Sequence, residues 1–216
     1  MPGLRLPHCP FAQFAPRCAA HRRRFSADDP RRWRLVRRWL VSLCILLITA
    51  VLAGLPVYVR PQIDALRHAD AILVLGGRDY DRYPFGIGLG EQGWAPIVVL
   101  SVDRWRTGFC ATPHPHLSLR CFIADPPTTK GEARELRSLA ANYGWRTIIV
   151  VTSRPHISRA RFILEHCFDG KLDMVESPGG SGVTAGRAGQ LSPLGWAYQY
   201  IYQTAGYARA AIEPGC

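Results

Sequence analysis

TIIVVTS, at residues 147–153, is a run of mostly β-branched apolar residues that ends in two hydroxyl side chains. A continuous apolar run of this length predicts a strand that is buried on both faces, as the strands of a parallel sheet are. Residues 70–77 and 96–101 repeat the pattern, and weaker strand candidates lie at 121–123 and 172–175. The sequence therefore predicts a sheet of buried strands.

Amphipathic helices are expected between and after these strands. Apolar side chains recur at helical spacing in residues 131–143 and again in 155–168, and Gly144 suits the position after a helix end. Ser192 and Pro193 begin a third helix as N-cap and first helical residue. This helix is expected to cover the sheet with the face formed by Leu194, Ala197, Tyr198, Ile201, Ala205, Ala208 and Ile212. Alternating strands and helices predict an α/β fold, with a mostly parallel sheet covered on both faces.

An uncharged apolar run of 21 residues, from Trp39 to Val59, precedes the first strand. About 20 apolar residues are enough to cross a bilayer as a helix, so residues 39–59 are predicted to form a transmembrane helix. A cleaved signal peptide is the alternative, with Val51-Leu52-Ala53 before the cut. The apolar run continues past Ala53, which favours the anchor. The chain is thus expected to have a tail at 1–38, the membrane helix, and one domain at 60–216.

The net charge of +11 is unevenly distributed along the chain. Residues 1–59 carry ten arginines against two aspartates, a formal charge of +8, whereas residues 60–216 carry only +3. An excess of arginine on one side of a membrane helix predicts that this side is cytoplasmic. We interpret the charge as a topology signal at the plasma membrane and not as a nucleic-acid patch. The tail, expected to be disordered, then lies in the cytoplasm, and residues 60–216 lie outside it.

Four of the seven cysteines, Cys110, Cys121, Cys167 and Cys216, lie in the domain that is expected to be exported. An even number of cysteines in an oxidising compartment is typical of disulfides, and four cysteines allow three connectivities. We predict a Cys110–Cys121 bond, which would staple the irregular stretch 101–122, and a second bond between Cys167 and Cys216. Four free thiols are the alternative. No C-x-x-C spacing occurs, so the sequence predicts no metal site, and it identifies no cofactor.

Residues that can carry chemistry gather at the predicted C-terminal ends of the strands, where parallel sheets bind ligands. Three segments lie there, residues 76–78, 128–132 and 153–159. The last two are at the starts of predicted helices, and helix N-termini suit an anion because they expose N–H groups and partial positive charge. An arginine in the first turn of such a helix can add a bidentate contact to a carboxylate or phosphate. The candidate ligand-binding residues are Gly76, Gly77, Thr128, Thr129, Glu132, Ser153 and Arg159, with His156 as a candidate acid or base.

Each of these features also has a purely structural interpretation. Thr129-Lys130-Gly131-Glu132 matches a capping box, in which side chains satisfy the helix N–H groups without a ligand. Gly76-Gly77 can be a simple turn at a strand end, and it does not begin the G-x-G-x-x-G fingerprint of dinucleotide sites. His156 can be an ordinary surface histidine. Gly86, Gly88 and Gly90 follow no buried strand directly and are expected in a loop or a loose helix.

Three motifs lie in this region: residues 70–77, then Thr128-Thr129-x-Gly131-Glu132-Ala133, then Val151-Thr152-Ser153-x-x-His156-x-x-Arg159-Ala160. Together they resemble the bacterial SanA/ElyC/YdcF family, over about residues 68–178. The resemblance implies a Rossmann-like three-layer fold, an N-terminal membrane anchor, and a role in envelope integrity or cell-wall precursor metabolism. The chain departs from the family at Ser101-Val102-Asp103, where Ser-Gly-Gly is frequent, and at Glu132, where an asparagine is frequent.

The function expected from residues and resemblance together is that of a membrane-anchored YdcF/SanA/ElyC-like protein of cell-wall biogenesis or barrier integrity. It would bind an anionic, phosphate- or carboxylate-bearing envelope metabolite through Thr128, Thr129 and the helix N–H groups, with Arg159 as a clamp. A non-catalytic binding or scaffold module is the first alternative. The second alternative is a transferase that binds S-adenosylmethionine or a nucleotide, and one YdcF-like member is associated with S-adenosylmethionine binding. This alternative suits an exported domain poorly, because S-adenosylmethionine is a cytoplasmic cofactor.

Overall fold

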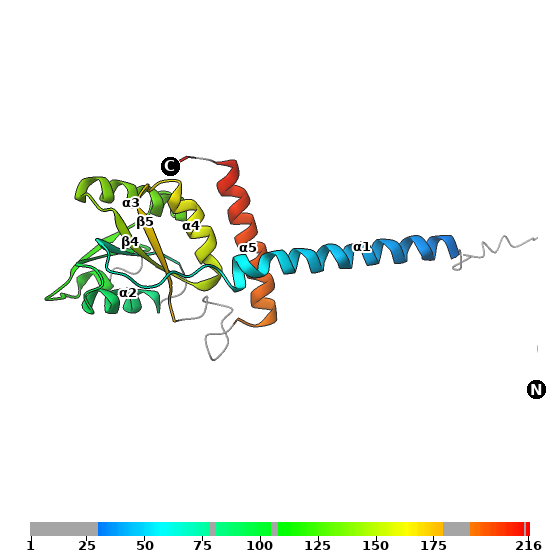
Figure 1. The fold of residues 1–216 in the computed structure, drawn as a ribbon, viewed down its shortest axis with the longest axis horizontal. Helices are drawn as coiled ribbons and strands as arrows, with labels where there is room; N and C mark the ends of the chain where they lie inside the picture. Colours follow the sequence, from blue (N-terminus) through cyan, green and yellow to red (C-terminus); the bar gives the residue numbers. More distant parts are fainter. Residues whose placement is uncertain (1–29, 78–80, 105–107, 179–190, 214) are drawn as a thin grey trace, which may run out of the picture. The chain divides into compact units, whose positions relative to one another are not determined.

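The computed structural model describes residues 30–77, 81–104, 108–178, 191–213 and 215–216 (Figure 1). Residues 1–45 and 46–216 form two separate units. Residues 1–29 of the basic tail, for which disorder was expected, lie outside the described residues, whereas residues 30–38 of the tail are helical.

Five parallel strands form one sheet in the order β3-β2-β1-β4-β5. The order reverses between β1 and β4, which are neighbours in the sheet although two strands separate them in the sequence. The predicted α/β fold with a parallel, Rossmann-like sheet is confirmed, and all five expected strands are present. Their bounds are β1 Ala71–Val74, β2 Ile97–Ser101, β3 Ser118–Phe122, β4 Thr147–Thr152 and β5 Lys171–Glu176.

Helices cover both faces of the sheet, and each face has its own hydrophobic core (Figure 1). α3 (Thr129–Tyr143) and α4 (Ile157–Glu165) pack on the face that presents Leu73 and Val150, while α2 (Arg82–Glu91) packs on the face of Val74 and Val151. The predicted inner faces of α3 and α4 are correct, because their apolar residues are buried apart from the partly buried Leu139 and the exposed Tyr143 at the end of α3. Gly144 adopts the left-handed conformation expected after a helix end.

The spaced glycines belong to helix α2 and not to a loop. A methyl group added at Gly86 would lie 2.3 Å from Cγ2 of Val74 in β1. The small residue therefore permits α2 to approach the sheet closely, which the glycine spacing alone did not indicate. α2 in turn places Arg82 at the C-terminal end of β1 and Tyr83 against Ser101 at the end of β2.

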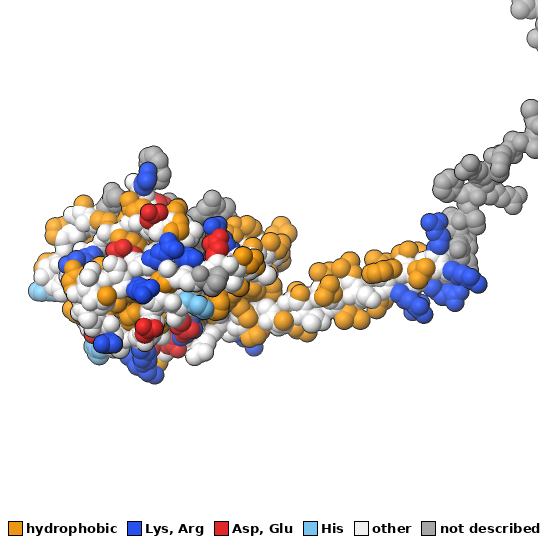
Figure 2. Space-filling model, turned by 90° about the horizontal axis from the view of Figure 1, so that it is seen from above, with side chains coloured by type: hydrophobic (Ala, Val, Ile, Leu, Met, Phe, Trp, Pro, Cys, Tyr) orange, Lys and Arg blue, Asp and Glu red, His pale blue; other side chains and the backbone are white. Residues whose placement is uncertain are grey.

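The apolar segment near the N-terminus forms helix α1 (Pro30–Gly54), which continues into a short π-helix, η1 (Leu55–Val59). The stretch Arg31–Val59 spans 29 residues and is long and apolar enough to cross a membrane, and it is the single such helix in the described part of the chain. Hydrophobic side chains cover it along its length, with Lys and Arg side chains near its N-terminal end (Figure 2). The described residues thus include one candidate membrane span, with basic residues at one end.

Helix α5 (Pro193–Ile212) begins as predicted, because the Ser192 hydroxyl accepts a hydrogen bond from the Gly195 N–H. The prediction of its inner face is wrong. The buried residues of α5 are Gly195, Gln199 and Gln203, whereas Ile201 on the predicted apolar face is 73% exposed. The helix turns this side inward because Gln199 and Gln203 are hydrogen-bonded to each other and Gln203 also accepts a hydrogen bond from Arg159.

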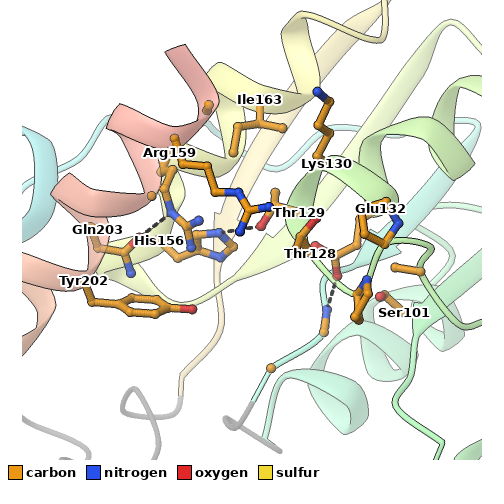
Figure 3. Close-up of a pocket in the computed structure, with 18 of the residues that line it drawn as sticks. Ser101, Thr128, Thr129, Lys130, Glu132, His156, Arg159, Ile163, Tyr202 and Gln203 are labelled. Carbon is orange, nitrogen blue, oxygen red and sulfur yellow. Dashed lines mark hydrogen bonds between the residues drawn. The ribbon is translucent and has the colours of Figure 1, made fainter. Parts of the chain in front are cut away.

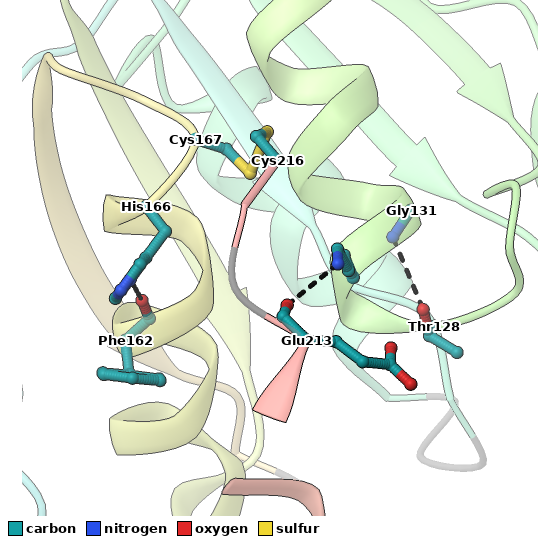
Figure 4. Close-up of a disulfide and its surroundings, with 8 residues drawn as sticks. Thr128, Gly131, Phe162, His166, Cys167, Glu213 and Cys216 are labelled. Carbon is teal, nitrogen blue, oxygen red and sulfur yellow. Dashed lines mark hydrogen bonds between the residues drawn. A yellow bond between two sulfur atoms is a disulfide. The ribbon is translucent and has the colours of Figure 1, made fainter. Parts of the chain in front are cut away.

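Both predicted disulfides are present, Cys110–Cys121 and Cys167–Cys216. The second joins the C-terminal residue to the segment after α4 (Figure 4). It closes a loop with a sequence separation of 49 residues that contains the whole of α5. Lys130 strengthens the same connection, since its Nζ donates to the Glu213 carbonyl at 2.9 Å. The end of α5 is therefore held against α3 and α4.

Candidate functional site

A cleft of about 1420 Å³ opens at the C-terminal ends of the strands. It lies where the strand order reverses, the usual position of a ligand site in an open α/β sheet. The three segments expected to meet there do so. All eight residues singled out from the sequence line the cleft: Gly76, Gly77, Thr128, Thr129, Glu132, Ser153, His156 and Arg159.

Glu132 braces the floor of the cleft. Its Oε1 accepts a hydrogen bond from the Gly76 N–H at 2.6 Å, and Ser101 is hydrogen-bonded to the same carboxylate. Burial raises the pKa of Glu132, while these hydrogen bonds and the charge of Arg82 oppose the rise. The carboxylate thereby joins the ends of β1 and β2 to helix α3.

The capping-box interpretation of this segment is wrong. The N-cap of α3 is Thr128, whose hydroxyl accepts from the Gly131 N–H, so Thr129 is already the first helical residue. Glu132 does not reach back to the helix start, because it bonds to Gly76 in the neighbouring strand turn. The motif that looked local is therefore a tertiary contact.

Gly77 turns the chain at the end of β1 with a φ of 135°, a conformation that residues with a side chain rarely adopt. Below the turn, Nη1 of Arg82 donates to the carbonyls of Leu75 at 3.1 Å and Gly76 at 2.7 Å. Arg82 is almost completely buried. This arginine holds the turn in place and adds positive charge beneath it.

His156 is buried between two threonine hydroxyl groups. Its Nε2 lies 3.2 Å from Oγ1 of Thr129, and its Nδ1 lies 2.9 Å from Oγ1 of Thr152. Burial, together with the charges of Arg159 and Arg82, lowers the pKa of His156 well below 6.5. The imidazole is therefore neutral at neutral pH, and a surface position for this histidine is ruled out.

Arg159 is positioned by helix α5. Its Nε donates to Oε1 of Gln203 at 2.7 Å, and its guanidinium lies 5.5 Å from the ring centre of Tyr202 (Figure 3). Burial lowers the pKa of Arg159, but an arginine remains charged at neutral pH. A guanidinium carries five N–H donors, so these contacts leave donors that can reach a ligand. The side chain combines a fixed position with spare donors.

The charges around the cleft are mixed. Five Arg or Lys residues and four Asp or Glu residues line it. At the floor, two arginines face one carboxylate, whereas Asp103, Asp125 and Glu213 are exposed at the rim. Positive charge is thus in excess in the inner part of the cleft, where the two arginines lie.

The sequence reasoning missed Arg82 and the inner face of α5, which contributes Gln199, Tyr202 and Gln203 to the cleft. Nε2 of Gln203 donates to Oε1 of Gln199 at 2.9 Å, and both side chains are buried. Two glutamines four residues apart in an otherwise apolar helix were the available signal. No comparable signal pointed to Arg82.

Among the described residues, no group of three or more His, Cys, Asp or Glu side chains is arranged to hold a metal ion.

Comparison of the chain with protein-family models, with curated proteins and with solved structures finds no match in any of the three. The geometry of the cleft and the candidate membrane span are therefore the basis for a functional hypothesis.

Proposed function

We propose that this chain is a membrane-anchored protein of the cell envelope whose exported domain binds an anionic, phosphate- or carboxylate-bearing metabolite in the cleft. The observation that carries the proposal is the position of Arg159, a charged guanidinium fixed by Gln203 in the same cleft as the start of α3. The N–H groups at a helix start and a guanidinium fork both favour oxyanions. The resemblance to the SanA/ElyC/YdcF family supports a role in cell-wall biogenesis or barrier integrity.

Thr128 and the first N–H groups of α3 would hold one part of the anion, and Arg159 would hold another. Gly77 is exposed at the β1 turn and has no side chain, so a ligand could approach its backbone closely, whereas the N–H and the carbonyl of Gly76 are already bonded to Glu132 and Arg82. Ser153 lies at the end of β4 and lines the same cleft. Glu132 and Arg82 would act indirectly, since their described partners belong to the protein and hold the turn in place.

A binding protein without catalysis is a second candidate function, and the surroundings of His156 favour it. Both ring nitrogens already face threonine hydroxyl groups. Any proton that His156 exchanges with a ligand would therefore pass through Thr129, whose hydroxyl lies between the imidazole and the helix start. Chemistry in the cleft would thus require a Thr129–His156 relay.

The ligand proposal is tested by isolating the full-length protein from its native membranes in mild detergent and analysing the bound small molecules by mass spectrometry. A phosphate- or carboxylate-bearing compound should be enriched over a purification of an unrelated anchored protein. Enrichment of neutral compounds only would contradict the anion site, and S-adenosylmethionine would point to the transferase. If incubation converts the ligand, Thr129→Val should stop the conversion and retain binding, whereas an unchanged ligand indicates a binding protein.

The proposed orientation, with the tail in the cytoplasm and the domain outside, rests on the charge of +8 in residues 1–59. Alkaline phosphatase fused after Cys216 should be active, because that enzyme needs an oxidising compartment to form its disulfides. A fusion to the tail at Ala27 should be inactive. The reverse pattern would place the domain in the cytoplasm and make a cytoplasmic cofactor plausible again.

A further inference from the structure

The outer face of helix α5 is apolar and uncovered by the described residues. Leu194 is 83% exposed, Ile201 73% and Ile212 80%. At helical spacing, these residues share one side of α5 with Ala197 and Ala208, and no charged residue interrupts them. An apolar side this long on one helix needs an explanation, because soluble helices normally turn such a side toward the core.

The orientation of α5 is fixed by polar contacts on its inner side. Gln199 and Gln203 are buried, bonded to each other, and Gln203 also accepts from Arg159. Rotation of the helix to bury Ile201 would break these bonds, and polar groups that stay buried without partners are destabilising. The hydrogen bonds on the inner side therefore hold the apolar side of α5 outward.

Helix α5 is also bound to the end of the apolar helix α1. The Tyr200 hydroxyl donates to the carbonyl of Val51 at 3.0 Å, and a methyl group added at Gly54 would lie 2.2 Å from the Tyr200 ring. The Tyr58 hydroxyl lies 2.9 Å from the hydroxyl of Thr204. All of these residues belong to the same unit, 46–216. The contacts place one side of α5 alongside residues 51–58.

The length of the apolar run puts these contacts at the level of the membrane. From Trp39 to Val51 there are 13 residues, which extend about 20 Å as a helix, whereas the hydrocarbon core of a bilayer is about 30 Å thick. The whole run to Val59 is needed to cross it. The part of the span that α5 contacts therefore lies near the outer boundary of the bilayer, and α5 lies there with it.

We infer that α5 is an interfacial helix whose outer side, formed by Leu194, Ile201 and Ile212, sits in the boundary between lipid headgroups and acyl chains. The helix has the features of such elements, an apolar side and tyrosines with a polar tip, here the half-exposed Tyr198 and Tyr202 on the flank that adjoins the cleft. Its inner side would then form the wall of the cleft nearest the membrane. The inference rests on the membrane anchoring proposed above and is independent of the anion site.

The test uses nitroxide spin labels on the full-length protein in vesicles of equal parts zwitterionic and anionic phospholipid. Cys9, Cys18 and Cys44 are replaced by serine, both disulfides are kept, and a single cysteine is introduced as Ile201→Cys. The matched control is Ser138→Cys, which is exposed on helix α3. Collision rates with oxygen, which concentrates in lipid, and with a water-soluble nickel chelate are measured at both positions.

The label at position 201 should be reached by oxygen at least severalfold more readily than by the nickel chelate, and the label at position 138 should show the opposite preference. Equal preferences at the two positions would overturn the inference, because the outer side would then face water. If the label at position 201 is shielded from both reagents, and if its spectrum shows spin–spin broadening that disappears when unlabelled protein is added, the outer side is covered by a second copy of the chain. This result would also overturn the inference. Failure of the protein to float with the vesicles would overturn the anchor itself, and this outcome is separate from the other two.

Discussion

Replacing Arg159 with alanine is expected to weaken binding of the anionic ligand roughly tenfold to a hundredfold, the usual effect of losing a hydrogen bond to a charged group. Arg159 is fixed by Gln203 and lies over Tyr202, so it loses little freedom when a ligand arrives. The measurement is equilibrium binding of the co-purified ligand to the full-length protein in detergent. Inorganic phosphate serves as a simpler probe of the same contact.

Arg159→Lys separates recognition from packing. Lysine retains the positive charge and a long side chain beside α5, but an ammonium group cannot reproduce the planar fork of a guanidinium. The lysine variant should therefore unfold at nearly the same temperature as the wild type while binding remains impaired. Arg137→Ala, an exposed arginine of α3 outside the cleft, is the matched control and should bind normally. Wild-type affinity in both Arg159 variants would remove the main support for the anion site.

Replacing Cys216 with serine should destabilise the domain by about 4 kcal/mol, which the chain-entropy relation gives for a closed loop of this length. The sequence separation of Cys167 and Cys216 is 49 residues. For a domain of this size, such a loss lowers the unfolding temperature by roughly 10 °C. The measurement is thermal unfolding of the full-length protein in detergent, followed by near-ultraviolet circular dichroism.

The two disulfides allow an internal comparison. Cys110→Ser opens a loop with a separation of only 11 residues and should cost about 3 kcal/mol. A reductant should destabilise the wild type more than it destabilises either variant, because each variant has already lost one bond. Since the Cys167–Cys216 bond encloses α5, Cys216→Ser should also weaken ligand binding, whereas Cys110→Ser should affect it less. Four cysteines that react with an alkylating reagent without reduction would contradict both bonds.

Much of the fold was predictable from local sequence patterns. A run such as residues 147–153 is apolar on both faces of a strand, and such strands are typical of a parallel sheet with helices on each side. Once the strands are parallel, their C-terminal ends lie at one edge. Gly77, Thr129 and His156 therefore had to approach one another, whatever the details of packing.

What the sequence by itself determined was thus the sheet, the helices, the apolar span and the place where the candidate site residues meet, because each follows from hydrophobic periodicity or strand direction. The tertiary structure alone decided which partners these residues take. Glu132 bonds to Gly76, 56 positions away, although its spacing suggested a local cap. Helix α5 turns Gln203 inward and Ile201 outward because Arg159 and the end of the apolar helix are its neighbours. Periodicity shows that a helix has an apolar side, but the direction in which that side faces depends on contacts between segments far apart in the chain.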